Sequence, residues 1–391
     1  MSATLWVSRL RLTNFRCYAQ ARIDPVPGPV VLTGPNGAGK TNLLEALSLL
    51  APGRGLRRAR LEDLARRGVP ETPAEPQGWA VAATIETPDG AVDIGTGHNP
   101  QESRRRAVRV NDAAARSQTA LGDHVSAVWL TPQMDRLFIE GAAGRRRFLD
   151  RLVFGIDPKH AGRISAYDHA LRERARLLQD GVADRAWLDT LERTLAERGV
   201  AIAAARREMT ARLAGLCEAP LGPFPGARLV LTGTVESWLD DGPALAAEDK
   251  LQHGLQESRG RDAITGGAAI GPHRSDFTMH HLGNGMPADQ CSTGEQKALL
   301  IAIVLANARL ETAERDRAPL LLLDEVAAHL DVERREALFA ELLNLGAQAW
   351  LTGTDSAIFQ SLAGTAQFLA VSDGVIRDAE HNSGATPPHA R

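Results

Sequence analysis

Cysteine and long apolar runs are both scarce in this sequence. Its 391 residues include only three cysteines, Cys17, Cys217 and Cys291, which lie far apart and form no CxxC pair. This spacing argues against a zinc site and indicates a reducing compartment, so we expect a cytoplasmic protein. No run approaches the roughly 18 apolar residues that a membrane span needs, and the N-terminal segment lacks the apolar core of a signal peptide. We therefore expect no membrane partner.

Net charge is also small, at −3, so the total does not point to a polyanionic partner. The arginines, however, are concentrated in the first half of the chain. They form four groups: Arg54, Arg57, Arg58, Arg60, Arg66 and Arg67; Arg104, Arg105, Arg106 and Arg109; Arg145, Arg146, Arg147 and Arg151; Arg163, Arg172, Arg174 and Arg176. Any one group is more often a solvated face than a binding site. Because phosphate binding needs local rather than net charge, several together predict a basic surface.

Hydrophobic periodicity divides the chain into two α/β ends and a helical middle. Residues 5–25 predict one or two strands, residues 28–51 a strand, glycine loop and helix, residues 79–97 a hairpin, and residues 124–132 another strand. Helical spacing begins near residue 145, and the α/β pattern returns after about residue 265. We therefore predict an α/β domain built from residues 1–140 and 261–378, an inserted mainly helical domain at 141–260, and a disordered tail at 379–391.

A phosphate-binding loop is the clearest motif. Residues 34–41, GPNGAGKT, match G-x-x-x-x-G-K-[ST] between an apolar strand and a helix. Glycines let backbone N–H groups surround phosphates at the start of the helix. Lys40 would reach the β- and γ-phosphates of ATP, and the Thr41 hydroxyl would ligate Mg²⁺. The predicted nucleotide-binding set is Gly34, Pro35, Asn36, Gly37, Ala38, Gly39, Lys40, Thr41 and Asn42.

A second motif supplies carboxylates. Four leucines at 320–323 run directly into Asp324 and Glu325. Beside a phosphate loop, Asp324 would hold the Mg²⁺ shell and Glu325 would act as the general base that polarises the attacking water. A buried strand that ends in Asp-Glu is a weak signal alone, but together with the loop it predicts a nucleotide hydrolase.

The stretch CSTGEQKALL, residues 291–300, is a small-residue helix start about thirty residues before Asp324. By itself it fits an ordinary helix cap. The order of phosphate loop, long insertion, this helix start, Asp-Glu strand and HLD resembles ABC-type ATPases of the SMC-like branch. In that family the helix start is the signature motif, which binds the γ-phosphate of ATP held by the other subunit of a head-to-head dimer. The resemblance assigns this role to Ser292 and Gly294, and a nucleotide-facing role to Asp331 of HLD.

Within that branch the chain is most similar to the RecF family, over nearly its whole length. The segments TPQMDRLFIEGAAGRRRFLD, residues 131–150, and GPHRSDF, residues 271–277, carry this resemblance. It implies a homodimer that forms with ATP, binds double-stranded and gapped DNA, and hydrolyses ATP slowly with DNA stimulation. It also implies joint action with RecR and RecO, which helps RecA replace the single-strand-binding protein.

Some residues depart from the family pattern. Gln133 stands where an acidic residue is common and resembles the Q-loop of ABC ATPases, so we predict a catalytic and Mg²⁺-sensing role for it. Glu295 replaces the usual glutamine of the signature. The switch histidine is absent, and Thr354 or Asp355 stands near its place. His273 could contact nucleotide or DNA, or be structural.

Two alternative functions stay open at this point. One is a non-hydrolysing DNA-binding module, against which the intact set Lys40, Thr41, Asp324 and Glu325 argues. The other is an SMC-like head of a different DNA-maintenance system, which the lack of a long arm or a fused nuclease disfavours. For DNA contacts the leading candidates are Arg54, Arg57, Arg58 and the run Arg104–Arg106.

Overall fold

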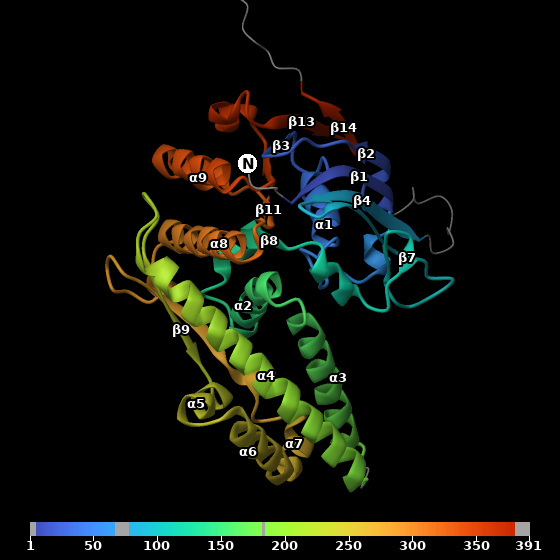
Figure 1. Cartoon of the computed structure of the whole chain (residues 1–391), viewed down its shortest axis with the longest axis vertical. Helices are drawn as coiled ribbons and strands as arrows, with labels where there is room; N and C mark the ends of the chain where they lie inside the picture. The colour runs from blue at the N-terminus through green and yellow to red at the C-terminus, as the bar shows by residue number, and fades with distance from the viewer. Residues whose placement is uncertain (1–4, 67–77, 182–183, 380–391) are drawn as a thin grey trace, which may run out of the picture.

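The computed structural model describes residues 5–66, 78–181 and 184–379, which form an α/β part and a mainly helical lobe (Figure 1). The α/β part holds two six-stranded sheets, and the helical lobe carries a two-stranded one. Arg67 and the predicted disordered tail from residue 380 lie outside the described residues. No helix in the described ranges combines the length and apolar character needed to cross a membrane.

The first sheet is antiparallel, in the order β2-β1-β4-β5-β6-β7. Its strands are β1 Trp6–Phe15, β2 Tyr18–Ile23, β4 Trp79–Thr87, β5 Gly90–His98, β6 Ala107–Val110 and β7 Ala113–Ala114. One face is apolar and buried, with Leu10 and Leu12 of β1 pointing inward, whereas Arg9 and Arg11 of the same strand are exposed. The hairpin predicted at residues 79–97 is confirmed by the antiparallel pairing of β4 with β5.

The second sheet is parallel except at one edge, in the order β14-β13-β3-β12-β11-β8. Its strands are β3 Val30–Thr33, β8 Ala127–Leu130, β11 Leu320–Leu323, β12 Ala349–Gly353, β13 Gln367–Ser372 and β14 Val375–Asp378. Strands from both ends of the chain alternate here: β3 lies between β13 and β12, and β8 lies beside β11. The carboxyl ends of sequence-distant strands therefore meet at one edge.

Helices cover both faces of this parallel sheet (Figure 1). Helix α1, Lys40–Ser48, packs in one apolar core between the two six-stranded sheets. On the other face, α8 Thr293–Arg315 and α9 Val332–Leu345 share a second core with the sheet. Because β11 is covered on both sides, all four of its leucines are buried, which explains its unbroken apolar sequence.

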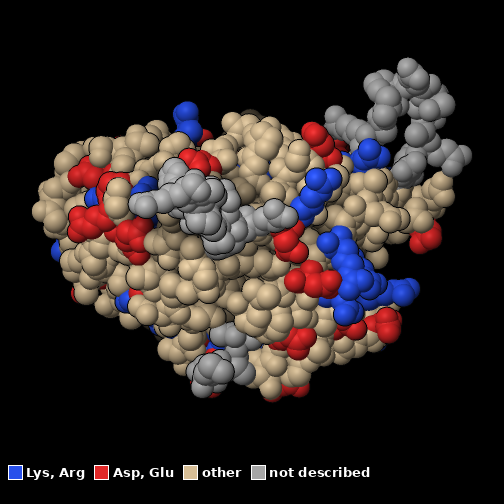
Figure 2. All heavy atoms as spheres, turned by 90° about the horizontal axis from the view of Figure 1, so that it is seen from above, with Lys and Arg blue, Asp and Glu red and all other residues tan. Residues whose placement is uncertain are grey.

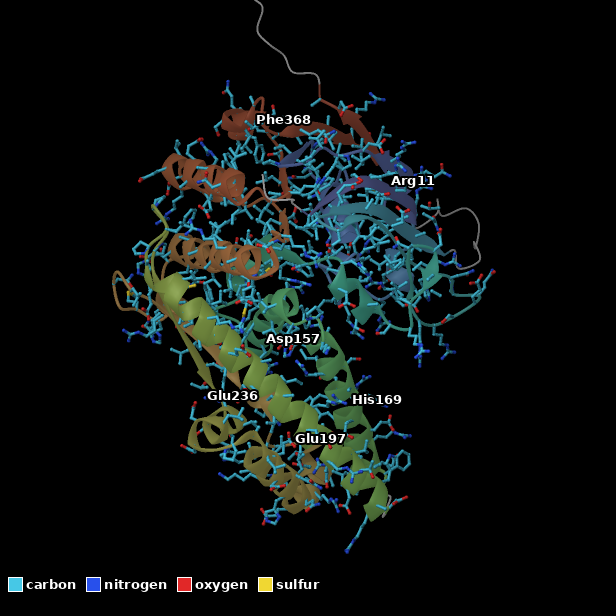
Figure 3. All side chains as sticks on the ribbon, viewed as in Figure 1. Arg11, Asp157, His169, Glu197, Glu236 and Phe368 are labelled. Carbon is cyan, nitrogen blue, oxygen red and sulfur yellow. The ribbon has the colours of Figure 1, made fainter. Side chains whose placement is uncertain are left out.

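The helical lobe projects from the α/β part (Figure 1). It contains α2 Ala142–Ile156, α3 His160–Gln179, α4 Arg185–Glu218, α5 Thr234–Asp241, α6 Ala244–Glu257, α7 Arg259–Thr265 and the antiparallel pair β9 Ala227–Thr232 and β10 Asp276–His281. Along one face of α4, Leu188, Leu195 and Ile202 are buried and Leu191 is half-buried. Figure 3 places the labelled His169 and Glu197 in this lobe and Arg11 on the antiparallel sheet.

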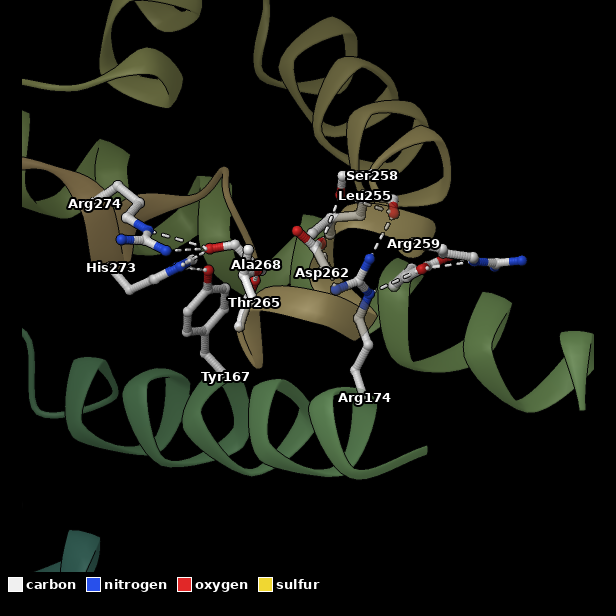
Figure 4. A network of polar contacts seen from close by, with 12 residues as sticks. Tyr167, Arg174, Leu255, Ser258, Arg259, Asp262, Thr265, Ala268, His273 and Arg274 are labelled. Carbon is white, nitrogen blue, oxygen red and sulfur yellow. Dashed lines mark hydrogen bonds and ion pairs between the residues drawn. The ribbon is translucent and has the colours of Figure 1, made fainter. Parts of the chain in front are cut away.

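A buried ionic network stabilises the far part of this lobe (Figure 4). The Arg174 guanidinium donates to Glu192 Oε1 and Asp262 Oδ2, each at 2.9 Å, and to the Leu255 carbonyl at 2.6 Å. Arg259 pairs with the same Glu192. Arg174, which the sequence placed in a basic group, is thus neutralised inside the lobe, since buried charges need partners.

Short 3-10 helices complete the chain: η1 Glu62–Leu64, η2 Gln118–Asp123, η3 Pro132–Arg136, η4 Pro272–Arg274, η5 Ala288–Gln290, η6 Ala327–His329 and η7 Ser356–Leu362. The predicted domain limits at residues 140, 260 and 378 stay predictions. Strand β10, which follows the predicted limit at 260, pairs with β9 of the helical lobe before the chain reaches α8.

Candidate nucleotide-binding site

The phosphate loop connects β3 to α1. Gly34 and Gly39 have φ values of 147° and 121°, and a Cβ at Gly34 would lie 2.1 Å from the Val371 carbonyl oxygen. Both positions therefore require glycine. The Lys40 ammonium donates to the carbonyl oxygens of Gly34 and Pro35 at 2.6 and 2.9 Å. Burial lowers the Lys40 pKa, while the charge of Glu325 raises it. The positive charge of Lys40 therefore lies inside the phosphate loop, where it would attract an anionic group such as a phosphate.

Asp324 follows β11 at the edge where the parallel strands end. The Thr41 hydroxyl lies 3.0 Å from both carboxylate oxygens of Asp324. The two residues are 283 positions apart, so the fold brings together the pair that the sequence assigned to Mg²⁺. Burial raises the pKa of Asp324, and the hydroxyl groups of Thr352 and Thr41 oppose that change.

Thr352 is a site residue that sequence reasoning missed. It lies near the end of β12, beside β11, and its hydroxyl donates to Asp324 Oδ1 at 2.8 Å. The Thr352 hydroxyl oxygen in turn accepts a hydrogen bond from the backbone N–H of Glu325 at 2.9 Å. A lone threonine in a strand carries no spacing signal, and only the strand order could have indicated it. The predicted neighbour Asp355 instead caps η7 by accepting the Ala357 N–H.

Glu325 is half-buried and has a φ of 54°. Few residues other than glycine adopt this left-handed conformation, which is costly and is held here by the bond to Thr352. Burial lowers the pKa of both Lys40 and Lys297, and the negative charge of Glu325 opposes that change in each of them. Glu325 therefore lies close to the phosphate loop, as a base acting on a nucleotide there would.

Gln133 lies in η3, directly after β8. Because Leu130 of β8 pairs with Leu323 of β11, Gln133 emerges at the same sheet edge as Asp324. Its side chain is exposed and makes no hydrogen bond to any other described residue. The ionic contact of this segment comes from Asp135, whose carboxylate lies 3.8 Å from the Lys297 ammonium on α8. The catalytic and Mg²⁺-sensing role of Gln133 stays a prediction.

Ser292 is the N-cap of α8 and forms a capping box with Glu295. The Ser292 hydroxyl and backbone N–H donate to Glu295 Oε2 at 2.8 and 2.9 Å. These bonds lower the Glu295 pKa. Gly294 is exposed, and no atom lies within 4 Å of the place its Cβ would take. The structure thus explains Glu295 as a cap, and it leaves the surface above Gly294 open.

The remaining predicted ligands flank these motifs. Asn42 on α1 accepts from Arg57 at 2.8 Å and donates to Cys17. Asp331 is exposed and caps α9 by accepting the Arg334 N–H at 2.8 Å. No hydrogen bond or ion pair joins residues 34–42 to residues 291–295, both of which are fully described. The nucleotide contacts of Asp331, Ser292 and Gly294 stay predictions.

His273 has a structural environment in the helical lobe. Its Nδ1 lies 2.7 Å from the Tyr167 hydroxyl, and its Nε2 lies 3.0 Å from the Ala268 carbonyl oxygen (Figure 4). Burial lowers its pKa, which favours a neutral ring. Both ring nitrogens are engaged within the protein, which favours the structural interpretation of His273 over a contact with nucleotide or DNA.

The arginine groups separate into inward and outward members. Arg106 is wrong as a DNA candidate, because its guanidinium donates to the carbonyls of Leu49 and Gly53 and to the Thr96 hydroxyl. Burial lowers the Arg106 pKa to about 10. Arg104 and Arg105 are exposed.

Figure 2 shows Lys and Arg side chains gathered over the antiparallel sheet, beside acidic ones. Arg9 and Arg22 of that sheet both pair with Asp24.

Comparison with known proteins decides the family. The model of the RecF/RecN/SMC N-terminal domain matches residues 6–376. The RecF protein of Mesorhizobium japonicum, a DNA replication and repair protein, is 50% identical over 383 residues, covering 97% of this chain and 100% of that protein. The chain belongs to the RecF family. A second RecF, from Rhizobium meliloti, is 47% identical over 380 residues, covering 96% of this chain and 99% of that protein.

Solved structures show the same fold. The recombination mediator RecF bound to ATPrS, from the RecFOR pathway, superposes with a TM-score of 0.83 at 22% identity, covering 97% of this chain and 100% of that one. An Smc head domain from Pyrococcus furiosus, bound to the C-terminal domain of ScpA, gives 0.55 at 18% identity, with 96% of both chains covered. The chain therefore has the SMC-like, ABC-type ATPase fold that its motif order predicted.

Proposed function

We propose that the chain is an ATP-dependent DNA-binding protein of recombinational gap repair. In this proposal ATP drives a head-to-head homodimer onto double-stranded DNA near gaps, ATP is hydrolysed slowly with DNA stimulation, and RecA loading follows with RecO and RecR. The observation that carries it is the cluster of Thr41, Asp324 and Thr352 beside the Lys40 loop. Membership of a family whose named relatives replicate and repair DNA supports the wider role.

The residues of the site fit ATP with Mg²⁺. Hard cations prefer oxygen ligands, and the Thr41 hydroxyl and the Asp324 carboxylate supply them side by side. Bound Mg²⁺ would neutralise charge on the β- and γ-phosphates. Lys40 would exchange its bonds to the Gly34 and Pro35 carbonyls for phosphate oxygens. Glu325 would accept a proton from the attacking water, and Thr352 would hold both Asp324 and the Glu325 backbone in place.

The dimer part of the proposal rests on the signature. Within one chain, no polar contact joins the fully described loop 34–42 to the helix start 291–295, and the backbone at Gly294 is exposed. A helix N-terminus with free N–H groups attracts an anion. A second copy of the chain could bring its own γ-phosphate to this surface. The Ser292 hydroxyl, which Glu295 now holds, would then turn to that phosphate.

The proposal is tested by binding of a gapped duplex to the protein with ATP, with ADP and without nucleotide, alongside the oligomeric mass. ATP should give a dimer and tighter DNA binding, and ADP should give neither. The Lys40→Met variant should lose both effects, because it lacks the charge that pairs with phosphate. Equal DNA affinity in all three nucleotide states would refute the ATP switch. Tight binding and dimerisation without any hydrolysis would favour the non-hydrolysing module instead.

A further inference from the structure

The four arginines of the segment GRRRFLDR, residues 144–151, divide into two pairs. Arg145 and Arg146 point into the protein, where Arg145 binds Asp276 and Arg146 donates to the Ser275 carbonyl at 2.6 Å. Arg147 and Arg151 are four residues apart, so they share another face of α2. Within residues 5–66, 78–181 and 184–379, neither has a hydrogen-bond or carboxylate partner. Arg145 and Arg146 therefore have a structural role, whereas Arg147 and Arg151 are available to bind a ligand.

Arg151 is held in place by an aromatic ring. Its guanidinium stacks on Trp129 of β8, with its central carbon 2.9 Å from the ring centroid. Stacking of this kind orients the guanidinium plane and leaves its edge N–H groups to donate. The nearest acidic residue on α2, Asp150, is already engaged by Arg206 and His160. Arg151 is therefore a positioned donor with no anion.

The loop after α1 brings further arginines to the same place. Ala51 and Pro52 line a small cavity together with Arg151 and Phe154, so this loop lies directly on α2. Arg54 and Arg58 follow in the loop, and both are exposed. Burial and then the charges of Arg147 and Arg54 lower the Arg58 pKa, and burial and then the charge of Arg58 lower that of Arg151. Arg58 is thus close enough to repel each of the other three guanidiniums.

Counter-charge at this cluster is slight. The carboxylate of Asp168 on α3 raises the Arg58 pKa, but its effect is weaker than that of burial or of the charges of Arg147 and Arg54. In the described part of the chain, Arg54 and Arg58 likewise have no ion pair. The neighbouring Arg57 differs, since it pairs with Glu45 and Asn42 on α1. Four like charges from two segments, with so little compensation, cost stability unless an external anion joins them.

We propose that Arg54, Arg58, Arg147 and Arg151 form one phosphate-binding site for the backbone of duplex DNA, at the junction of the loop after α1 with α2. The exposed guanidiniums of Arg54, Arg58 and Arg147 have the fork geometry that matches phosphodiester oxygens, and the half-buried Arg151 adds its positive charge behind them. Arg151 covers Trp129, so this ring offers no free face on which an unpaired base could stack. Contacts to the DNA backbone carry no sequence information, so the proposed site binds duplex without sequence preference. It deepens the DNA binding under the proposed function and rests on it.

The test measures duplex affinity by fluorescence anisotropy with ATP, across a range of salt, for Arg58→Gln, Arg147→Gln and the double variant. Arg261→Gln is the matched control, since Arg261 on α7 is also exposed and has no ion pair in the described ranges. Each single variant should bind about tenfold more weakly, with a salt slope reduced by about 0.9 for the lost phosphate contact. The loss of affinity in the double variant should be smaller than the product of the two single-variant losses, because both arginines contact one phosphate.

Several results would overturn the site. Wild-type affinity and salt slope in both single variants, with the wild type itself binding DNA, would remove it and leave the proposed function intact. No DNA binding by the wild type would remove both. A duplex with neutral methylphosphonate linkages should bind weakly, and equal binding of that duplex would contradict a phosphate contact. Competition by polyglutamate as strong as by duplex would assign the site to acidic protein instead. Melting temperatures at or above wild type in the variants exclude misfolding as the cause.

Discussion

Arg145 and Asp276 form a two-pronged ion pair across the base of the helical lobe. Arg145 Nε and Nη2 lie 2.8 Å from the two Asp276 carboxylate oxygens, although the residues are 131 positions apart. Arg145 also donates to the carbonyls of Phe138 and Glu140, at the end of the segment that holds Gln133. The two segments on which the resemblance to the RecF family rests, residues 131–150 and 271–277, thus meet, and their contact is a structural joint.

Breaking this joint should destabilise the protein without removing its nucleotide ligands. Arg145→Ala should lower the free energy of unfolding by about 2 kcal/mol, as for other charged hydrogen bonds. Denaturant unfolding measures it, and ATP affinity should hold. Asp276→Ala should cost a similar amount, and the double variant clearly less than the sum. Additive losses would mean that the two side chains act independently.

Much of the site could be predicted from the sequence because its motifs are continuous. The phosphate loop needs glycines and Lys40 in one short stretch, and Asp324 ends an apolar strand, so spacing reveals both. Thr352 could not be found this way, because its role depends on β12 lying beside β11. Arg106 was placed wrongly, because a run of three arginines does not show which member turns inward.

Thr352→Val should impair hydrolysis more than nucleotide binding. Valine keeps the shape of threonine but removes the hydroxyl that donates to Asp324 and accepts the Glu325 N–H. We expect the ATPase rate to fall by about ten- to a hundredfold, as for loss of a hydrogen-bond partner that orients a metal ligand. Thr352→Ser keeps the hydroxyl and should retain most activity. Full activity in the valine variant would show that Thr352 positions nothing.

Glu325→Gln should bind ATP and fail to hydrolyse it. A carboxamide keeps the size of the side chain but is a far poorer proton acceptor. Single-turnover hydrolysis should drop by about 10²–10⁴-fold, and the ATP dimer should persist on DNA. Glu325→Asp is the control that retains a base. If the glutamine variant turns over at the wild-type rate, the general base lies elsewhere.

Glu311 on α8 should make stability depend on pH. It is buried against Ser126 and Asn307, and burial raises its pKa from 4.5 to about 7. The folded protein then holds a proton that the unfolded chain has released between these values, so stability falls as pH rises through this window. Over that range the loss from this group is about 3 kcal/mol.

Glu311→Gln should remove that component. The amide cannot ionise, so the variant should be more stable than wild type at pH 8, and the difference should vanish near pH 4.5. Unfolding in denaturant at the two pH values measures it. The same pH dependence in both proteins would show that Glu311 is ionised in the folded state.

Ser292→Arg tests the shared nucleotide site. The phosphate loop, Lys40 and Thr41 make no contact with Ser292 within the described chain, so the variant should bind ATP nearly as wild type. A bulky cation at the N-cap of α8 would fill the exposed surface beside Gly294, where the γ-phosphate bound to a second chain would have to lie, so two variant chains should not dimerise. Mixing it with Lys40→Met should leave one intact composite site in each heterodimer and restore part of the ATPase activity.

The oligomeric mass of Ser292→Arg with saturating ATP is therefore the most direct measurement of the central claim, that two chains complete one ATP site. Sedimentation beside the wild type, with ATP affinity measured on the same samples, separates loss of dimerisation from loss of binding. The account predicts a wild-type dimer and a variant monomer that has bound ATP. A variant that dimerises with ATP like the wild type would contradict it and leave residues 291–295 as an ordinary helix cap.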